Sequence, residues 1–108
     1  MCNIYKFKDF KNGWIVGSFE PSLFKSSTEI AIHEHKKGIV DHHHIHKLCN
    51  EYNMVLDGVL IVNGQRLVKY DIFHIAPYQI SDIEFLTDCR LLVIKDKSNT
   101  FDKYTVKL

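Results

Sequence analysis

Short stretches of alternating apolar and polar residues recur along the chain, and residues typical of turns separate them. Alternation with a period of two is the pattern of a β-strand that buries one of its faces. It predicts strands over residues 14–19, 28–36, 40–46, 51–56, 59–62, 65–68, 72–76, 83–86, 90–95 and 104–108. Residues 23–27 could form one short turn or helix, and the sequence contains no long helical pattern.

The Asn63-Gly64 pair is the strongest turn signal, because both residues tolerate the positive φ that a type I′ hairpin requires. Many short strands joined by turns indicate an all-β sandwich or barrel. The chain has 108 residues and contains no internal repeat or linker. We therefore expect a single domain over residues 1–108.

Histidine is the unusual feature of the composition, since four of the seven histidines lie between residues 42 and 46. A strand over 40–46 places His42, His44 and His46 on one face. On this basis His42 could also lie in a pocket formed on that face. His33 and His35 share a face of the strand over 28–36, where they could form a second ligand pair, although we favour surface or core imidazoles.

Composition and charge exclude several classes of protein. Hydrophobic residues make up 45% of the chain and charged residues 25%, which is enough apolar surface for a folded core. The net charge is +1, and the lysines are scattered, often beside acids as in Lys95-Asp96-Lys97. We interpret them as a solvated mixed-charge surface, so neither nucleic acid nor a membrane surface is an expected partner.

The expected compartment is the cytoplasm, or the host cytoplasm if the protein is viral or from a phage. The sequence has no apolar run of the ~20 residues that span a bilayer, and its first residues lack the apolar region of a signal peptide. Three cysteines without a CxxC pair predict reduced thiols rather than a disulfide framework.

The chemistry of a metal site is concentrated in His44, His46 and Glu51. Residues two apart on a strand point the same way, so the two imidazoles can address one ion. Four intervening residues let the chain turn and return Glu51 on the neighbouring strand. Two imidazoles and one carboxylate suit Fe, Mn, Ni, Cu or Zn better than Ca or Mg, and they leave coordination positions open.

The spacing around these residues resembles the first sequence motif of the cupin family. Gly38 is followed after five residues by His44, then by His46, by Glu51 after four more residues, and by Gly58 after a further six. All five positions are in register with that motif. The resemblance implies a cupin jelly-roll-like β-barrel with a divalent transition metal in its mouth.

The second cupin motif is altered in this chain. Asp71 and Pro77 match it, whereas Tyr70 and Gln79 stand in place of its two glycines. Asp82 stands where the family has a further histidine. Asp82 could therefore ligate the ion, act as the catalytic base beside it, or orient a ligand histidine.

The chain is most similar to the small single-domain cupins of bacteria and phages that have no assigned function. The family resemblance also implies a homodimer, and exposed strand edges favour pairing. Trp14, Ile15 and Phe19 are the expected contact residues. The resemblance does not fix one reaction, because cupins include dioxygenases, isomerases and ligand sensors.

Three functions remain open at this stage. The first is a metal-dependent enzyme, of the dioxygenase or isomerase type, acting on a small polar metabolite. The second is a non-catalytic binding or sensor protein for a small molecule such as a sugar or nucleotide. The third is a barrel that has lost its metal.

Overall fold

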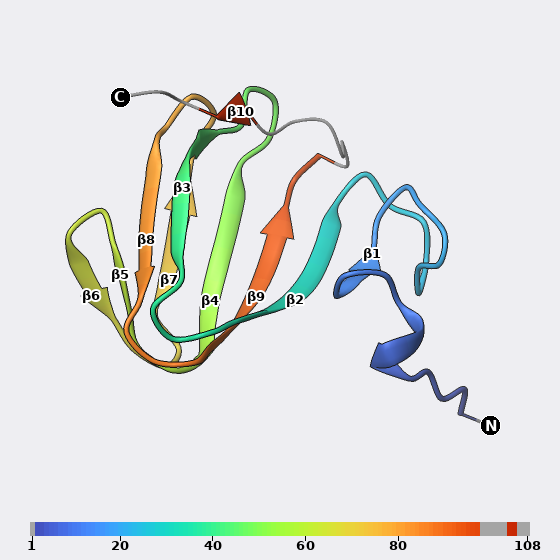
Figure 1. Ribbon diagram of the computed structural model, residues 1–108. Helices are drawn as coiled ribbons and strands as arrows, with labels where there is room; N and C mark the ends of the chain where they lie inside the picture. The colour runs from blue at the N-terminus through green and yellow to red at the C-terminus, as the bar shows by residue number, and fades with distance from the viewer. Residues whose placement is uncertain (1, 98–103, 106–108) are drawn as a thin grey trace.

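The computed structural model describes residues 2–97 and 104–105, and of residues 41–44 and 105 it describes the backbone alone. These residues form two five-stranded antiparallel sheets (Figure 1). The first sheet has the order β1 (Trp14–Val16), β2 (Glu29–His35), β9 (Cys89–Lys95), β4 (Glu51–Asp57), β7 (Ile72–Ile75). The second has the order β10 (Tyr104–Thr105), β3 (Val40–Ile45), β8 (Ser81–Phe85), β5 (Leu60–Val62), β6 (Gln65–Leu67). The prediction of an all-β fold is confirmed.

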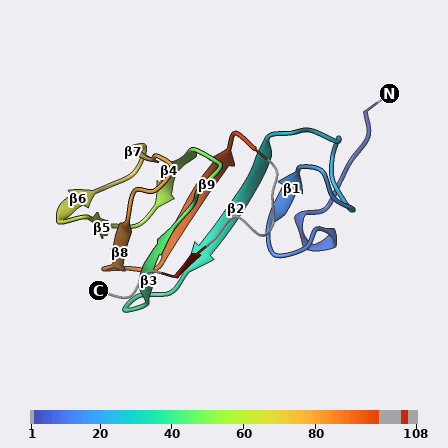
Figure 2. The same ribbon diagram turned by 90° about the horizontal axis from the view of Figure 1, so that it is seen from above.

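The two sheets are stacked layers and not a closed barrel. Seen from above, β3 and β8 lie in one layer, and β4, β9 and β2 lie in the other, with β1 at its outer end (Figure 2). Within the described residues, no ladder of paired strands joins the edge of one sheet to the edge of the other. The expectation of a barrel is corrected in this respect. The edge strands β1, β6, β7 and β10 have only two to four residues each, which limits the backbone hydrogen bonds that could close the edges.

Turn chemistry sets the order of the strands. Asn63 and Gly64 have φ values of 47° and 82°, as a type I′ turn requires, and they join β5 to β6. The Oδ1 atom of Asn63 accepts a hydrogen bond of 2.8 Å from the backbone N–H of Asp82, which fixes this hairpin to the start of β8. Residues 23–27 are irregular, with bends at 23, 24 and 27, and the one helical turn of the described residues is a 3-10 turn, η1 (Phe7–Asp9).

The core lies between the two layers, where the inward residues of each strand alternate with outward ones. Its members come from both sheets: Ala31, Val55, Leu60, Ile83, Phe85, Leu91 and Val93. Ala31 is fully buried on one face of β2, while its neighbours Ile30 and Ile32 are half-buried on the other. Burial of large side chains such as Leu60 and Phe85 stabilises the fold by about 2–3 kcal/mol each.

All three cysteines are unbonded to one another, as the sequence predicts. Cys49 and Cys89 are buried, and Cys2 is exposed near the N-terminus. A search of the described residues for a helix long and apolar enough to cross a membrane found none.

Candidate metal centre

His46 and Glu51 meet across the short connection between β3 and β4. His46 follows the last residue of β3, and Glu51 is the first residue of β4. The Nε2 atom of His46 lies 3.5 Å from Oε1 of Glu51, and the two side chains are 1% and 13% exposed. The structure therefore brings together two of the three predicted metal ligands in a nearly water-free position.

Three neighbours hold the Glu51 carboxylate in its ionised form. Burial of this carboxyl group raises its pKa, and this is the largest single effect. The hydrogen bond with His46, the positive charge of Lys95 and the hydrogen bond from Asn53 together outweigh it, and they lower the pKa to about 2. The Nδ2 atom of Asn53 donates to Oε2 at 3.2 Å, and the Nζ atom of Lys95 lies 3.9 Å from Oε1.

The positions of these donor atoms fit a shared metal ion. Nitrogen and oxygen ligands bind transition metals at about 2.0–2.2 Å, so two neighbouring ligands of one ion lie about 3.0–3.5 Å apart. The 3.5 Å between His46 and Glu51 agrees with that spacing. An ionised carboxylate is also the form that binds a cation.

The structure describes the backbone position of His44 and not its side chain. It lies in β3 opposite Ser81 of β8 on one side and Thr105 of β10 on the other. The register between β3 and β8 shifts between Asp41 and His44, where three steps on β3 match two on β8. Such a bulge breaks the simple alternation, so His42 and His44 cannot be assigned to one face from the period of two alone.

The side chains of residues 41–44 lie outside the described part of the structure, so ligation by His44 stays a prediction. Among the side chains that are described, no group of three histidines, cysteines or acids is close enough to hold an ion. The described part of the centre is therefore the His46–Glu51 pair.

The alternation of β8 sets the position of Asp82. The β8 strand buries Ser81, Ile83 and Phe85 and exposes Asp82 and Glu84, so Asp82 lies on the outer face of its sheet. The inward residue at this level is Ser81, which is 1% exposed and whose Oγ has no hydrogen-bond partner among the described residues. The role of Asp82 as base, ligand or orienting residue therefore stays a prediction.

Sequence reasoning missed two charged residues of the interior, Lys95 and Glu29. Lys95 stands opposite Glu51 on β4 and opposite Glu29 on β2. Its side chain is 15% exposed, so it is not part of the expected solvated surface. The signal was present in the alternation, because Lys95 is in phase with the buried Leu91 and Val93.

Comparison with known proteins relates the fold to solved structures. Scans against protein-family models and curated proteins found no match. The chain superposes on a sugar phosphate isomerase of the cupin superfamily from Silicibacter pomeroyi with a TM-score of 0.61, at 17% identity, over 78% of this chain and 59% of that one. The chain has the cupin fold.

Two further cupin-fold neighbours bear on the chemistry. KdgF from Halomonas sp. aligns with a TM-score of 0.63 and 18% identity, over 68% of this chain and 72% of that one. The pirin YhhW from Escherichia coli, solved in complex with nickel(II), aligns with a TM-score of 0.66 and 19% identity. That alignment covers 81% of this chain but only 39% of YhhW. At these identities the comparisons establish the cupin fold and no activity.

Proposed function

We propose that this cupin-fold chain binds one divalent transition-metal ion through His44, His46 and Glu51, and acts there as an enzyme on a small polar metabolite. The observation that carries the proposal is the buried His46–Glu51 pair, with Nε2 and Oε1 3.5 Å apart. Two solved neighbours support it, since one holds nickel(II) and another is a sugar phosphate isomerase. The metal would be Fe, Mn, Ni, Cu or Zn.

A bound ion would supply Lewis acidity, polarising an oxygen of the substrate at an open coordination position. The residues of the chain prepare the site for it. Asn53 and Lys95 hold the Glu51 carboxylate ionised and oriented, which keeps a negative ligand available at neutral pH. Burial of His46 fixes the imidazole and excludes water from that side of the pair.

Elemental analysis of protein purified without a tag tests the metal. We expect about one equivalent of a transition metal per chain, and its loss in both the His46→Ala and the Glu51→Gln variants. His44→Ala tests the third ligand in the same way. His74→Ala is the matched control, because His74 is an exposed histidine bonded to Asn50, and it should retain the metal. Full metal content in the double variant of His46 and Glu51 would refute the site.

A second candidate function is non-catalytic binding of a small molecule such as a sugar or nucleotide. The observation that favours it is the exposed position of Asp82 on the outer face of β8, since the sequence suggests Asp82 as the proton-transferring residue. Turnover assays of metal-loaded protein across oxygenase and isomerase substrates distinguish the two functions. Turnover that Asp82→Asn leaves unchanged supports an enzyme with another base, whereas ligand binding without turnover supports the second candidate.

The homodimer is also a proposal. Of its expected contact residues, Trp14 packs within its own chain, edge-on to Phe19 with ring centroids 6.5 Å apart, and both rings are only partly buried. Strand β1 is an edge of the first sheet, and the backbone N–H of Leu23 in the following loop donates to the carbonyl oxygen of Ile15 at 2.7 Å. Light scattering tests the assembly, and a monomeric mass at micromolar concentration would remove it.

We further propose that the protein works in the cytoplasm. Support comes from the three cysteines, which carry no disulfide, as is usual in a reducing compartment. Fractionation of cells that express the untagged protein tests this location.

A further inference from the structure

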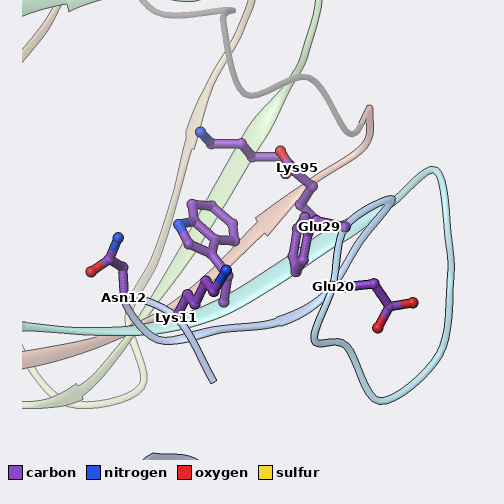
Figure 3. Close-up of a pocket in the computed structure, with 7 residues that line it drawn as sticks. Lys11, Asn12, Glu20, Glu29 and Lys95 are labelled. Carbon is purple, nitrogen blue, oxygen red and sulfur yellow. The ribbon is translucent and has the colours of Figure 1, made fainter. Parts of the chain in front are cut away.

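A cavity of about 230 Å³ opens beside β1, at the outer end of the first sheet (Figure 3). Its walls combine two aromatic rings, those of Trp14 and Phe19, with polar groups from Asn12, Glu29 and Lys95. Cavities for drug-sized ligands measure about 300–1,000 Å³, so this one suits a single ring with its substituents. None of the three proposed metal ligands lines it.

The buried acid of this cavity is Glu29. It is 2% exposed, and its carboxylate makes no hydrogen bond or ion pair within the described residues. Its position on β2 is in phase with the buried Ala31, so the carboxylate is directed inward. A buried carboxylate without donors is costly, and a ligand that supplies hydroxyl donors offsets this cost.

A lysine of the protein already occupies the place over the Trp14 ring where a cationic ligand would bind. The Nζ atom of Lys95 lies 5.0 Å from the centre of the Trp14 ring and 3.9 Å from Oε1 of Glu51. A ligand ammonium would have to compete with Lys95 for the indole face. The other acid, Glu20, pairs with Lys25 at 2.8 Å, and Figure 3 shows it pointing away from Glu29 and Lys95.

The wall as a whole favours neither sign of charge, because two acids, Glu20 and Glu29, are balanced by two lysines, Lys11 and Lys95. What remains is an uncharged ligand with several hydroxyl groups and an apolar ring face. We infer that this cavity binds a monosaccharide-type polyhydroxylated ring, which stacks its apolar face on the aromatic wall and donates hydroxyls to Glu29. Lys95 borders both this cavity and Glu51, but none of the proposed metal ligands lines the cavity, so its occupancy does not require the ion.

Trp14 provides the measurement, since it is the one tryptophan of the sequence. Titration of the intact protein with glucose, galactose and mannose should give a saturable change in indole fluorescence for at least one of them. A ligand of this size is expected to bind with a dissociation constant of about 1–10 mM. Choline and acetate serve as the cationic and anionic comparison probes.

Glu29→Gln keeps the shape of the side chain and removes its charge, so it should weaken hexose binding about tenfold. Glu34→Gln is the matched control, because Glu34 is on the same strand but exposed on its other face, and it should bind as the wild type does. Asn12→Gly is a second variant on an exposed loop residue with φ of 52°, where glycine fits the backbone. It should weaken binding several-fold even if Glu29→Gln does not fold.

The inference is overturned if no hexose produces a saturable change, or if choline or acetate binds more tightly than every hexose. Equal hexose affinity in the wild type, the Glu29→Gln and the Asn12→Gly proteins would also overturn it. Repeating the titration with EDTA and with His46→Ala separates the two proposals. Hexose binding that persists there supports this cavity whatever the fate of the metal site, and binding that disappears with the metal contradicts a separate cavity.

Discussion

The Nζ atom of Lys95 lies 3.9 Å from Oε1 of Glu51, and the two residues face each other across the β9–β4 ladder. This places a positive charge directly beside a proposed ligand of a metal cation. The same lysine keeps Glu51 ionised and repels the ion that Glu51 would bind. Substitution of Lys95 can therefore show whether this lysine strengthens or weakens metal binding.

Lys95→Met should raise metal affinity at pH 7.5 about tenfold. The pH of 7.5 lies far above both the pKa of Glu51, about 2, and the ordinary value of 4.5, so Glu51 stays ionised in the variant. The loss of repulsion between Lys95 and the cation therefore dominates. Competition with a chromophoric chelator measures the affinity. Lys97→Met, which removes an exposed lysine two residues away, is the control and should change little. Weaker metal binding by Lys95→Met would mean that the lysine acts chiefly by holding Glu51 in position.

Acid unfolding of the metal-free protein should depend on Glu51. Its pKa is about 2 in the folded chain against 4.5 as the ordinary value, so its ionisation stabilises the fold above pH 4.5. This stabilisation, roughly 3 kcal/mol, is lost as the pH falls from 4.5 to 2. Urea unfolding at a series of pH values should show a shallower acid slope for Glu51→Gln than for the wild type.

Glu84→Gln is the control for that experiment, because Glu84 is exposed on β8, and its acid slope should match the wild type. Parallel acid slopes for the wild type and Glu51→Gln would contradict the lowered pKa of Glu51.

Ser81→Ala should leave stability unchanged or increase it by about 1 kcal/mol. The hydroxyl is buried without a hydrogen-bond partner among the described residues, so its removal relieves a desolvation cost. Thermal unfolding of the metal-free protein measures the effect. A loss of 1–3 kcal/mol, as expected for a broken buried hydrogen bond, would instead show that Ser81 bonds a group beyond the described side chains, with His44 opposite it in the ladder as the first candidate.

The two glycines of the first motif should differ in their tolerance of alanine. Both have positive φ, 83° at Gly38 and 96° at Gly58. A Cβ atom at Gly38 would have no atom within 4 Å, whereas one at Gly58 would collide with the carbonyl oxygen of Asp88 and lie 2.6 Å from Sγ of Cys89.

We therefore expect Gly38→Ala to cost about 1 kcal/mol, from backbone strain alone, and Gly58→Ala about 3 kcal/mol or more. Chemical denaturation of both variants makes the comparison. Equal losses of stability in the two variants would show that backbone strain, and not contact with the Asp88 turn, sets the need for glycine.

Much of the fold could be predicted because turn residues and alternation act locally. The strand limits predicted over 28–36, 51–56 and 90–95 lie within one residue of the observed ends, and Asn63-Gly64 forms the expected hairpin. The structure shows the same alternation in β2, where Ala31 is buried and Ile30 and Ile32 are half-buried. Closure into a barrel could not be predicted, because it depends on the lengths of edge strands and not on their pattern.

The candidate site was predictable only in part, for a physical reason. His46 and Glu51 are near in sequence, so a short turn fixes their contact. The face on which the Asp82 side chain lies depends on where β8 begins. The strand starts at Ser81, two residues before its predicted start. That start puts Ser81 inside and Asp82 outside, since each step along a strand reverses the face. Glu29 and Lys95 were missed because charged residues are seldom assigned to a buried face.

The positions of the three cysteines allow thiol labelling to report on local and global unfolding of the chain. A thiol reagent should modify Cys2 at once, because this side chain is exposed, while Cys49 and Cys89 are shielded in the folded chain. Cys89 is on β9, at the centre of the first sheet, whereas Cys49 lies in the connection that carries the His46–Glu51 pair. The labelling rates of these two thiols therefore distinguish global unfolding from local breathing of the metal loop, without any substitution.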